Sequence, residues 1–271
     1  MQSSLIKVDL LMIACYLVKT MTDEYSPSIR LYVTDRLAEN ASINLDAEQS
    51  HYLVTVMRQK QGNIIELFNG RDGSFPAQIN IAHKKSSQLV CLRQNRPQLT
   101  GADLWLVFAP VKRTRLDFMA QKATELGASV IWPCQTDYTQ VGRVNTDRLE
   151  ANAIEAAEQS GRLDIPELRP FQRLDAILAD WPDDRVIIFC DELAAGKKWP
   201  ESNLSELVSH KAAIIIGPEG GFSARERELL LAKDNIVRLS LGPRILRADT
   251  AALSALTLFQ AFCGDWLETS S

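Results

Sequence analysis

The sequence contains few of the residue types and spacings on which metal and nucleophile sites are built. It has only 3 histidines and 5 scattered cysteines in 271 residues, with no C-x-x-C pair and no histidine at zinc-ligand spacing. No H-E-x-x-H motif, G-x-S-x-G motif or carboxylate cluster is present either. A mechanism without a metal ion or a covalent enzyme intermediate is therefore favoured, and the scattered thiols are typical of a reducing cytoplasm.

The sequence also lacks a hydrophobic run long enough to cross a membrane. Its best stretch, residues 10–18, is far shorter than the roughly 20 residues that a spanning helix needs, and Asp9 and Lys19 bracket it. No convincing signal peptide precedes it. Met21 follows soon after, and the first clear strand pattern begins near Ile29. We therefore expect residues 1–27 to be an N-terminal extension outside the fold, and the protein to be cytoplasmic.

An excess of positive charge, which nucleic-acid binding favours, is missing from the chain as a whole. Its net charge is −4, and 46% of its residues are hydrophobic, as in ordinary globular proteins. The charge is unevenly distributed, however. Residues 28–98 hold 9 Lys and Arg against 6 Asp and Glu, whereas residues 99–271 hold 19 against 25. The first half is therefore the better candidate for contact with a polyanion.

The two halves also differ in the secondary structure that their patterns predict. Residues 28–98 contain short strand patterns at 30–33, 63–68, 74–81 and 88–93, interrupted by one helix pattern at 46–57. Asn69-Gly70 supplies a turn between two of the strands. These features predict a small β-barrel or sheet.

Residues 99–271 alternate between strand and helix patterns, which predicts an α/β domain with a parallel sheet covered on both faces. Strands are expected at 104–109, 130–133, 185–190, 212–216 and 236–241. Helices are expected at 116–126 and 149–159, after a capping box formed by Ser223 and Glu226, and at 250–262. The last helix is apolar on nearly all sides, so it is expected to be buried.

Two glycine-rich loops follow predicted strands near the C-terminus, at residues 217–221 and 242–244. Open α/β sheets bind ligands at the carboxyl ends of their strands, and glycines let the backbone approach a ligand closely. Neither loop is a phosphate-binding P-loop or a G-x-G-x-x-G dinucleotide motif. Cations lie in the same region: Lys112 and Arg113 follow the first strand, and Arg244 and Arg247 flank an apolar pair.

Six short motifs occur in order along the chain, each modest alone and highly specific together. They are RLY at 30–32, HYLVTVMR at 51–58, QKATELG at 121–127, EQSGR at 158–162, IGPEGG at 216–221 and LGPRILR at 241–247. Through them the chain resembles, from about residue 30 to 266, the RsmE family of S-adenosylmethionine (SAM)-dependent RNA methyltransferases, members of the SPOUT (trefoil-knot) superfamily.

The resemblance implies a PUA-like RNA-binding barrel over residues 28–98 and a SPOUT methyltransferase domain with a C-terminal knot over residues 99–271. It implies a homodimer that methylates N3 of one uridine in the 16S rRNA of the small ribosomal subunit. In this family pattern, residues of the two loops and their flanks hold the cofactor SAM: Ile216, Gly217, Pro218, Gly220, Leu239, Leu241, Gly242, Ile245, Leu246 and Thr250.

Methylation at N3 requires loss of the uracil proton and stabilisation of the resulting anion. With this fold, Arg247 is the candidate for the stabilising cation, and Glu219 for the proton acceptor or a loop-orienting residue. The role of Asp249 stays open, because some relatives carry Thr-Glu-Thr where this chain has residues 248–250. Five cations are expected to contact RNA phosphates: Arg30, Arg58, Lys112, Arg113 and Arg162.

Two alternatives remain open. The chain could be a non-catalytic RNA-binding assembly factor with a vestigial cofactor pocket, or a methyltransferase of the same fold that acts on another RNA or base atom. A small-molecule enzyme is disfavoured, because a basic β-domain would then have no purpose.

Overall fold

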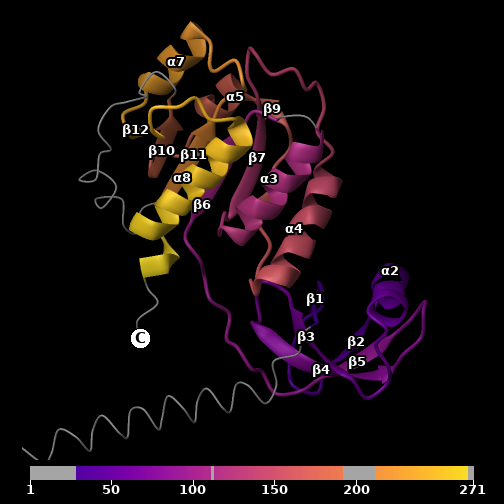
Figure 1. Cartoon of the computed structure of the whole chain (residues 1–271). Helices are drawn as coiled ribbons and strands as arrows, with labels where there is room; N and C mark the ends of the chain where they lie inside the picture. The colour runs from indigo at the N-terminus through magenta and orange to yellow at the C-terminus, as the bar shows by residue number, and fades with distance from the viewer. Residues whose placement is uncertain (1–28, 111–112, 192–210, 268–271) are drawn as a thin grey trace, which may run out of the picture. The chain divides into compact units, whose positions relative to one another are not determined.

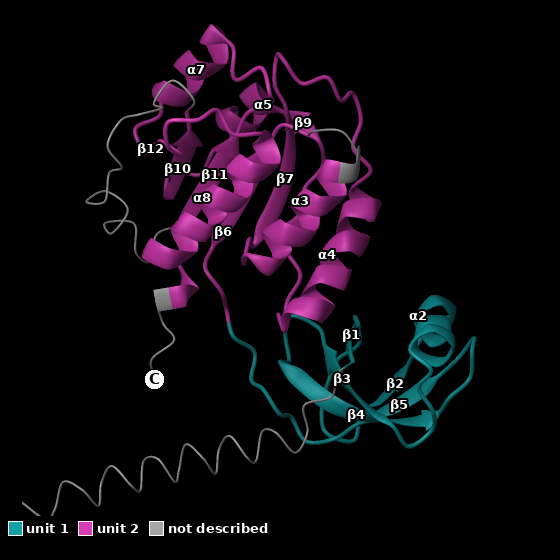
Figure 2. Cartoon of the chain, in the orientation of Figure 1, with its two compact units in different colours: residues 1–99 teal, residues 100–271 magenta. Residues whose placement is uncertain are grey.

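We analysed a computed structural model of the full chain, which describes residues 29–110, 113–191 and 211–267. The chain divides into two compact units, residues 1–99 and 100–271 (Figure 2). The extension expected over residues 1–27 lies outside the described residues, as does Lys112. Each unit is described by itself below.

The first unit is built on a five-stranded sheet that wraps around one apolar core. Its order is β1-β3-β4-β5-β2, with β1 parallel to β3 and the other pairs antiparallel. Side chains from all five strands share this core, including Leu31, Ile43, Leu67, Ala77 and Leu89, which fits the predicted small barrel-like domain. The bounds are β1 (Arg30–Tyr32), β2 (Ser42–Asn44), β3 (Ile64–Phe68), β4 (Ser74–Ile81) and β5 (Gln88–Cys91).

The helix predicted over residues 46–57 is present, but it changes type halfway. An α-helical turn, α2 (Ala47–His51), begins after Asp46, whose carboxylate accepts a hydrogen bond from the Gln49 amide. It continues as a π-helical segment, η1 (Tyr52–Val56), and Arg58 then adopts a left-handed backbone with φ of 54°. π-helical turns are rare in proteins, and a positive φ is uncommon for a residue other than glycine.

The second unit holds a sheet in which every pairing is parallel, as predicted (Figure 1). The strand order is β12-β10-β11-β6-β7-β8, and β9 also pairs with β7. The bounds are β6 (Leu104–Phe108), β7 (Val130–Gln135), β8 (Glu167–Leu168), β9 (Gln172–Arg173), β10 (Arg185–Cys190), β11 (Lys211–Ile216) and β12 (Ile236–Leu239).

Helices cover both faces of this sheet and create two apolar cores. Alternate residues of the central strands point to opposite faces, so Leu106 and Ile214 belong to one core and Val107 and Ile215 to the other. The first core is covered by α3 (Arg113–Glu125), α4 (Thr146–Ser160) and α8 (Ala248–Phe262), the second by α5 (Leu174–Ala179) and α7 (Ala224–Leu231).

Local signals in the sequence explain where these helices begin and end. The predicted capping box is present at α7: the Ser223 hydroxyl accepts from the Glu226 amide, and the Glu226 carboxylate accepts from the Ser223 amide. Gly127 and Gly161, after α3 and α4, both have a φ of 80°, the left-handed conformation that glycine adopts at low cost.

The expectation that the C-terminal helix is buried on all sides is wrong in part. The face of α8 that carries Ala252, Leu256 and Phe259 is buried against the sheet and α3, but Phe262 is exposed and Leu258 is only half-buried. The helix is apolar all round, yet the described residues of a single chain cover only one side of it. The structure does not describe residues 192–210, and the predicted C-terminal knot stays a prediction.

Candidate functional site

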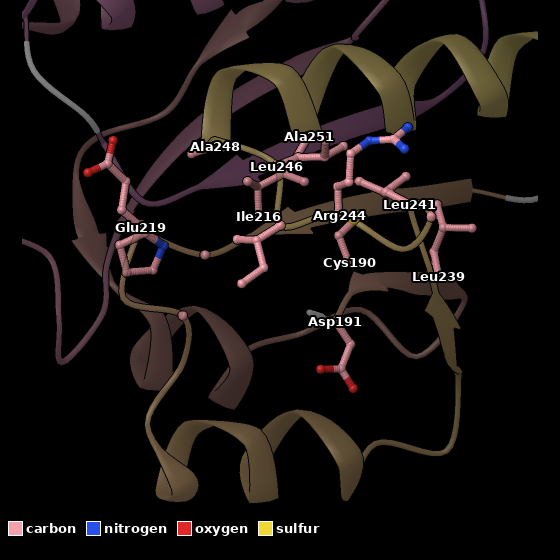
Figure 3. Close-up of a pocket in the computed structure, with 15 residues that line it drawn as sticks. Cys190, Asp191, Ile216, Glu219, Leu239, Leu241, Arg244, Leu246, Ala248 and Ala251 are labelled. Carbon is pink, nitrogen blue, oxygen red and sulfur yellow. The ribbon is translucent and has the colours of Figure 1, made fainter. Parts of the chain in front are cut away.

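A cavity lies at the carboxyl edge of the parallel sheet, where β10, β11 and β12 end next to one another. Cys190, Ile216 and Leu239, the last residues of these strands, all line it (Figure 3). The loops after β11 and β12 supply most of the remaining lining, and Ala248 and Ala251 of α8 close it from one side. The lining is a mixture of aliphatic side chains and loop backbone, which suits a flat heterocycle.

The first glycine of the β11–α7 loop is required by close packing. A Cβ placed on Gly217 would lie 2.7–3.1 Å from ring atoms of Phe222, which is itself buried and packs edge-on against Phe189. The ring therefore fixes the path of this loop at the cavity. In the second loop, Gly242 has a φ of 99°, a conformation that side chains other than glycine rarely adopt.

Arg115, in the first turn of α3, joins two segments that border the cavity. Its Nη1 donates to Glu219 Oε1 at 3.1 Å, and its Nε lies 3.7 Å from Asp249 Oδ2. Glu219 belongs to the β11–α7 loop and lines the cavity, whereas Asp249 lies in the first turn of α8. One cation thus ties the glycine loop to the helix that closes the cavity, and both carboxylates lie within reach of the same guanidinium.

Asp191 is a buried charged residue in the cavity wall. Its carboxylate is fully buried and pairs with Arg227 of α7 through both oxygens. It also accepts from Arg238 of β12 at 2.5 and 2.9 Å. Neighbouring Cys190 is no candidate nucleophile, because burial raises the pKa of its thiol far above the usual range and keeps it protonated.

The structure brings most of the predicted cofactor residues together. Eight of the ten line the cavity, and Glu219 does so as well. Gly220 and Thr250 are not among its lining residues but adjoin residues that are. Arg247 is exposed at the N-cap of α8 and is likewise outside the lining. The eight are Ile216, Gly217, Pro218, Leu239, Leu241, Gly242, Ile245 and Leu246.

The predicted RNA-contacting cations are in different situations. Arg58 is exposed. Arg30 is only 10% exposed, donates to Glu66 at 3.1 Å and lies over the Phe68 ring. Arg162 is also held within the fold, since it donates to Asp164 and to the Thr124 carbonyl in the last turn of α3. Arg113 is the first residue of α3, but its side chain, like Lys112, is outside the described part.

Four residues at the site were missed by the sequence reasoning: Asp191, Arg115, Arg227 and Arg238. Arg115 belongs to the basic cluster that begins at Lys112, and that cluster was the available signal for it. The link between Asp191 and Arg227 joins residues 36 apart, which no local pattern shows.

A family model described as RNA methyltransferase domain matches residues 98–260, and one described as RNA methyltransferase PUA domain matches residues 45–91. The Ribosomal RNA small subunit methyltransferase E of Rickettsia conorii is 36% identical over 84% of this chain and 93% of its own length. The chain belongs to the ribosomal RNA small subunit methyltransferase E family. The Bacillus subtilis member is 30% identical over 82% of this chain and 91% of its own length.

Solved structures agree with this membership. A Legionella pneumophila methyltransferase in complex with SAM is 31% identical, with a TM-score of 0.76 over 88% of this chain and 98% of that one. The family member from Neisseria gonorrhoeae, 24% identical with a TM-score of 0.79, has the same fold. The predicted SPOUT-type α/β fold with a PUA-like domain is thereby confirmed.

No helix in the described ranges is long and apolar enough to span a bilayer. The same ranges contain no cluster of three or more His, Cys, Asp or Glu side chains arranged to hold a metal ion.

Proposed function

We propose that this protein is a SAM-dependent methyltransferase that acts on the 16S rRNA of the small ribosomal subunit, in the cytoplasm, at N3 of a uridine. One observation carries the proposal. A chain of the ribosomal RNA small subunit methyltransferase E family has a cavity at the carboxyl edge of its parallel sheet, formed by the two glycine-rich loops. A relative that is 31% identical was solved with SAM bound.

The lining of the cavity fits SAM chemically. Leu239, Leu241 and Ile216 offer aliphatic contact for an adenine ring, and the loop backbone offers N–H and C=O groups for its polar edge. Gly217 and Gly242 keep the backbone free of side chains at this point. When bound, SAM supplies an electrophilic methyl group on a sulfonium, and the protein contributes binding, orientation and charge.

The charged groups around the cavity suit proton removal from N3 of uracil. Glu219 borders the cavity and can accept that proton, and Arg115 keeps its carboxylate in place. Asp249, which the same guanidinium contacts, is a second carboxylate at this position. Arg247 directly precedes α8 and is the candidate for stabilising negative charge on a uracil carbonyl oxygen.

RNA binding is assigned to exposed cations of the first unit, with Arg58 first among them. It follows the π-helical segment and is held in a left-handed backbone conformation. Arg30 and Arg162 act in this scheme through their ion pairs, which order the β3 edge and the end of α3. Lys112 and Arg113 remain candidates for phosphate contacts. Phosphate contacts make affinity fall steeply with salt.

A homodimer is proposed from the uncovered apolar surface of the second unit. Ile245 is 85% exposed, and Phe262 and Trp266 are 44% and 47% exposed. Exposed apolar side chains of this size on one helix and its flanking loops are typical of protein interfaces. Light scattering should give twice the mass of one chain.

The decisive experiment combines cofactor binding and methyl transfer. Calorimetry should detect SAM binding to the purified protein. Deletion of the gene should abolish 3-methyluridine in 16S rRNA, as measured by mass spectrometry of rRNA nucleosides, and the purified protein should restore it on small subunits from the deletion strain. No SAM binding would favour a non-catalytic assembly factor. SAM binding with an unchanged 3-methyluridine content would favour a methyltransferase acting on another base.

A further inference from the structure

An exposed aromatic side chain, Tyr138, packs against the outer side of the glycine loop. Tyr138 follows β7 and is 52% exposed. A Cβ placed on Gly220 would lie 3.5–3.7 Å from the Tyr138 Cβ, Cγ and Cδ2 atoms. The residues on either side of Gly220, Glu219 and Gly221, both line the cavity. The tyrosine thus borders the segment that lines the cofactor cavity, at the same carboxyl edge of the sheet.

The turn that carries Tyr138 is held closed by its own hydrogen bonds. The Thr139 amide donates to the Thr136 carbonyl at 3.1 Å, which closes a four-residue turn. The Thr139 hydroxyl accepts from the Thr136 amide at 2.9 Å, and the two hydroxyls lie 2.8 Å apart. Thr136 is buried. Tyr138 therefore lies in a turn whose first and last residues are joined by both backbone and side-chain hydrogen bonds.

The same turn is anchored to the start of α7. The Asp137 amide donates to Glu226 Oε1 at 2.8 Å, and the Ser223 hydroxyl donates to Asp137 Oδ2 at 2.6 Å. The Ser223 hydroxyl, with the Arg225 guanidinium, holds the pKa of Asp137 below its usual range, so the anchor stays ionised at neutral pH. The backbone around Tyr138 is thus fixed on both sides while its ring is left half in solvent.

We propose that Tyr138 is a stacking platform for an unpaired base of the RNA substrate. This inference rests on the proposed function and extends it. N3 of uracil lies on the Watson–Crick edge, so a base that presents it must leave its pair and its stack. An aromatic ring on a rigid turn replaces part of the lost stacking at low entropic cost. Because every base has a π face, this contact binds without reading the sequence.

The test compares substitutions at Tyr138 in steady-state methyl transfer to small subunits that lack the modification. Loss of a stacked base in Tyr138→Ala should raise KM for the subunits by roughly 5- to 150-fold. Tyr138→Phe keeps the ring and should stay close to the wild type. Tyr138→Leu keeps apolar packing on Gly220 without an aromatic face, and should resemble the alanine variant. Leu231→Ala, which removes an exposed apolar side chain at the far end of α7, is the matched control.

Calorimetric SAM affinity separates this role from a structural one. We expect the Kd for SAM to stay unchanged in all four variants. The inference is overturned if Tyr138→Ala leaves KM unchanged, if Tyr138→Phe is as impaired as Tyr138→Ala, or if the alanine variant loses SAM affinity or its dimeric state. A wild-type protein that binds SAM but methylates no small subunit would instead refute the proposed function.

Discussion

Replacement of Asp191 by asparagine should strongly destabilise the second unit. The Asp191 side chain is 0% exposed, and that of its bidentate partner Arg227 only 16%. Asn keeps the volume but removes the charge that pairs with the largely buried Arg227 guanidinium. Breaking a buried ion pair by removing one partner costs about 3–5 kcal/mol. Arg238 adds little to this cost, because it is 37% exposed and can regain hydration.

Urea unfolding followed by tryptophan fluorescence is the appropriate assay. All 5 tryptophans lie in residues 100–271, so the signal reports the second unit alone. The free energy of unfolding of Asp191→Asn should fall by about 3 kcal/mol or more at an unchanged m-value. Because Asp191 also lines the cavity, the variant should bind SAM more weakly.

Double-mutant cycles identify which arginine carries the effect. The coupling of Asp191 to Arg227 should exceed its coupling to Arg238, which is expected at about 1 kcal/mol or less. A loss below about 1 kcal/mol in Asp191→Asn, or equal coupling to both arginines, would refute the assignment of a buried ion pair to this wall.

Three further predictions concern the same unit. Gly217→Ala should destabilise the second unit by about 1–3 kcal/mol and weaken SAM binding, because the added methyl group would lie 2.7 Å from the Phe222 ring. Gly220→Ala makes only ordinary contacts, so its unfolding free energy and its SAM affinity should stay close to those of the wild type. Arg115→Ala should weaken SAM binding by only about two- to fivefold in calorimetry, because its ion pairs are partly exposed; a loss of a hundredfold would mean direct contact with the cofactor. Hydrogen bonding from Arg173 lowers the pKa of Asp175 to about 2. The contribution of the ionised Asp175 to stability is therefore present above pH 4 and lost as the pH falls toward 2. Asp175→Asn should make the free energy of unfolding depend less on pH in that range, and an unchanged pH dependence would contradict this.

Periodicity predicted the framework of the fold well. The strands at 74–81 and 185–190 have the predicted bounds, and α8 begins within two residues of the expected start. Long apolar runs identify buried parallel strands because both of their faces are covered. The two-residue strands β8 and β9 were missed, because segments that short carry no periodic signal, and the three-residue β2 was missed as well.

The sequence predicted the parts of the cavity that consist of glycine-rich loop backbone. It missed the parts that depend on pairing between side chains far apart in the sequence. Glycine loops after strands are a local pattern, so Gly217 and Gly242 were identified. Asp191 acquires its role only when α7 and β12 bring two arginines to it. Arg30 shows the converse: the sequence marks it as a cation, but only the fold reveals its pairing with Glu66 across 36 residues.

The strand order of the second unit also sets the order in which the chain can fold. β6 pairs with β11, so the hydrogen bonds of β6 on that side form only after Ala212, the partner of Leu104 more than 100 residues later, has been synthesised. α8, which covers the core over β6 and β11, is synthesised after every strand of the described sheet. Such non-local pairing slows folding and leaves apolar strands exposed during synthesis. Truncation before residue 248 would therefore leave one apolar face of the sheet partly uncovered.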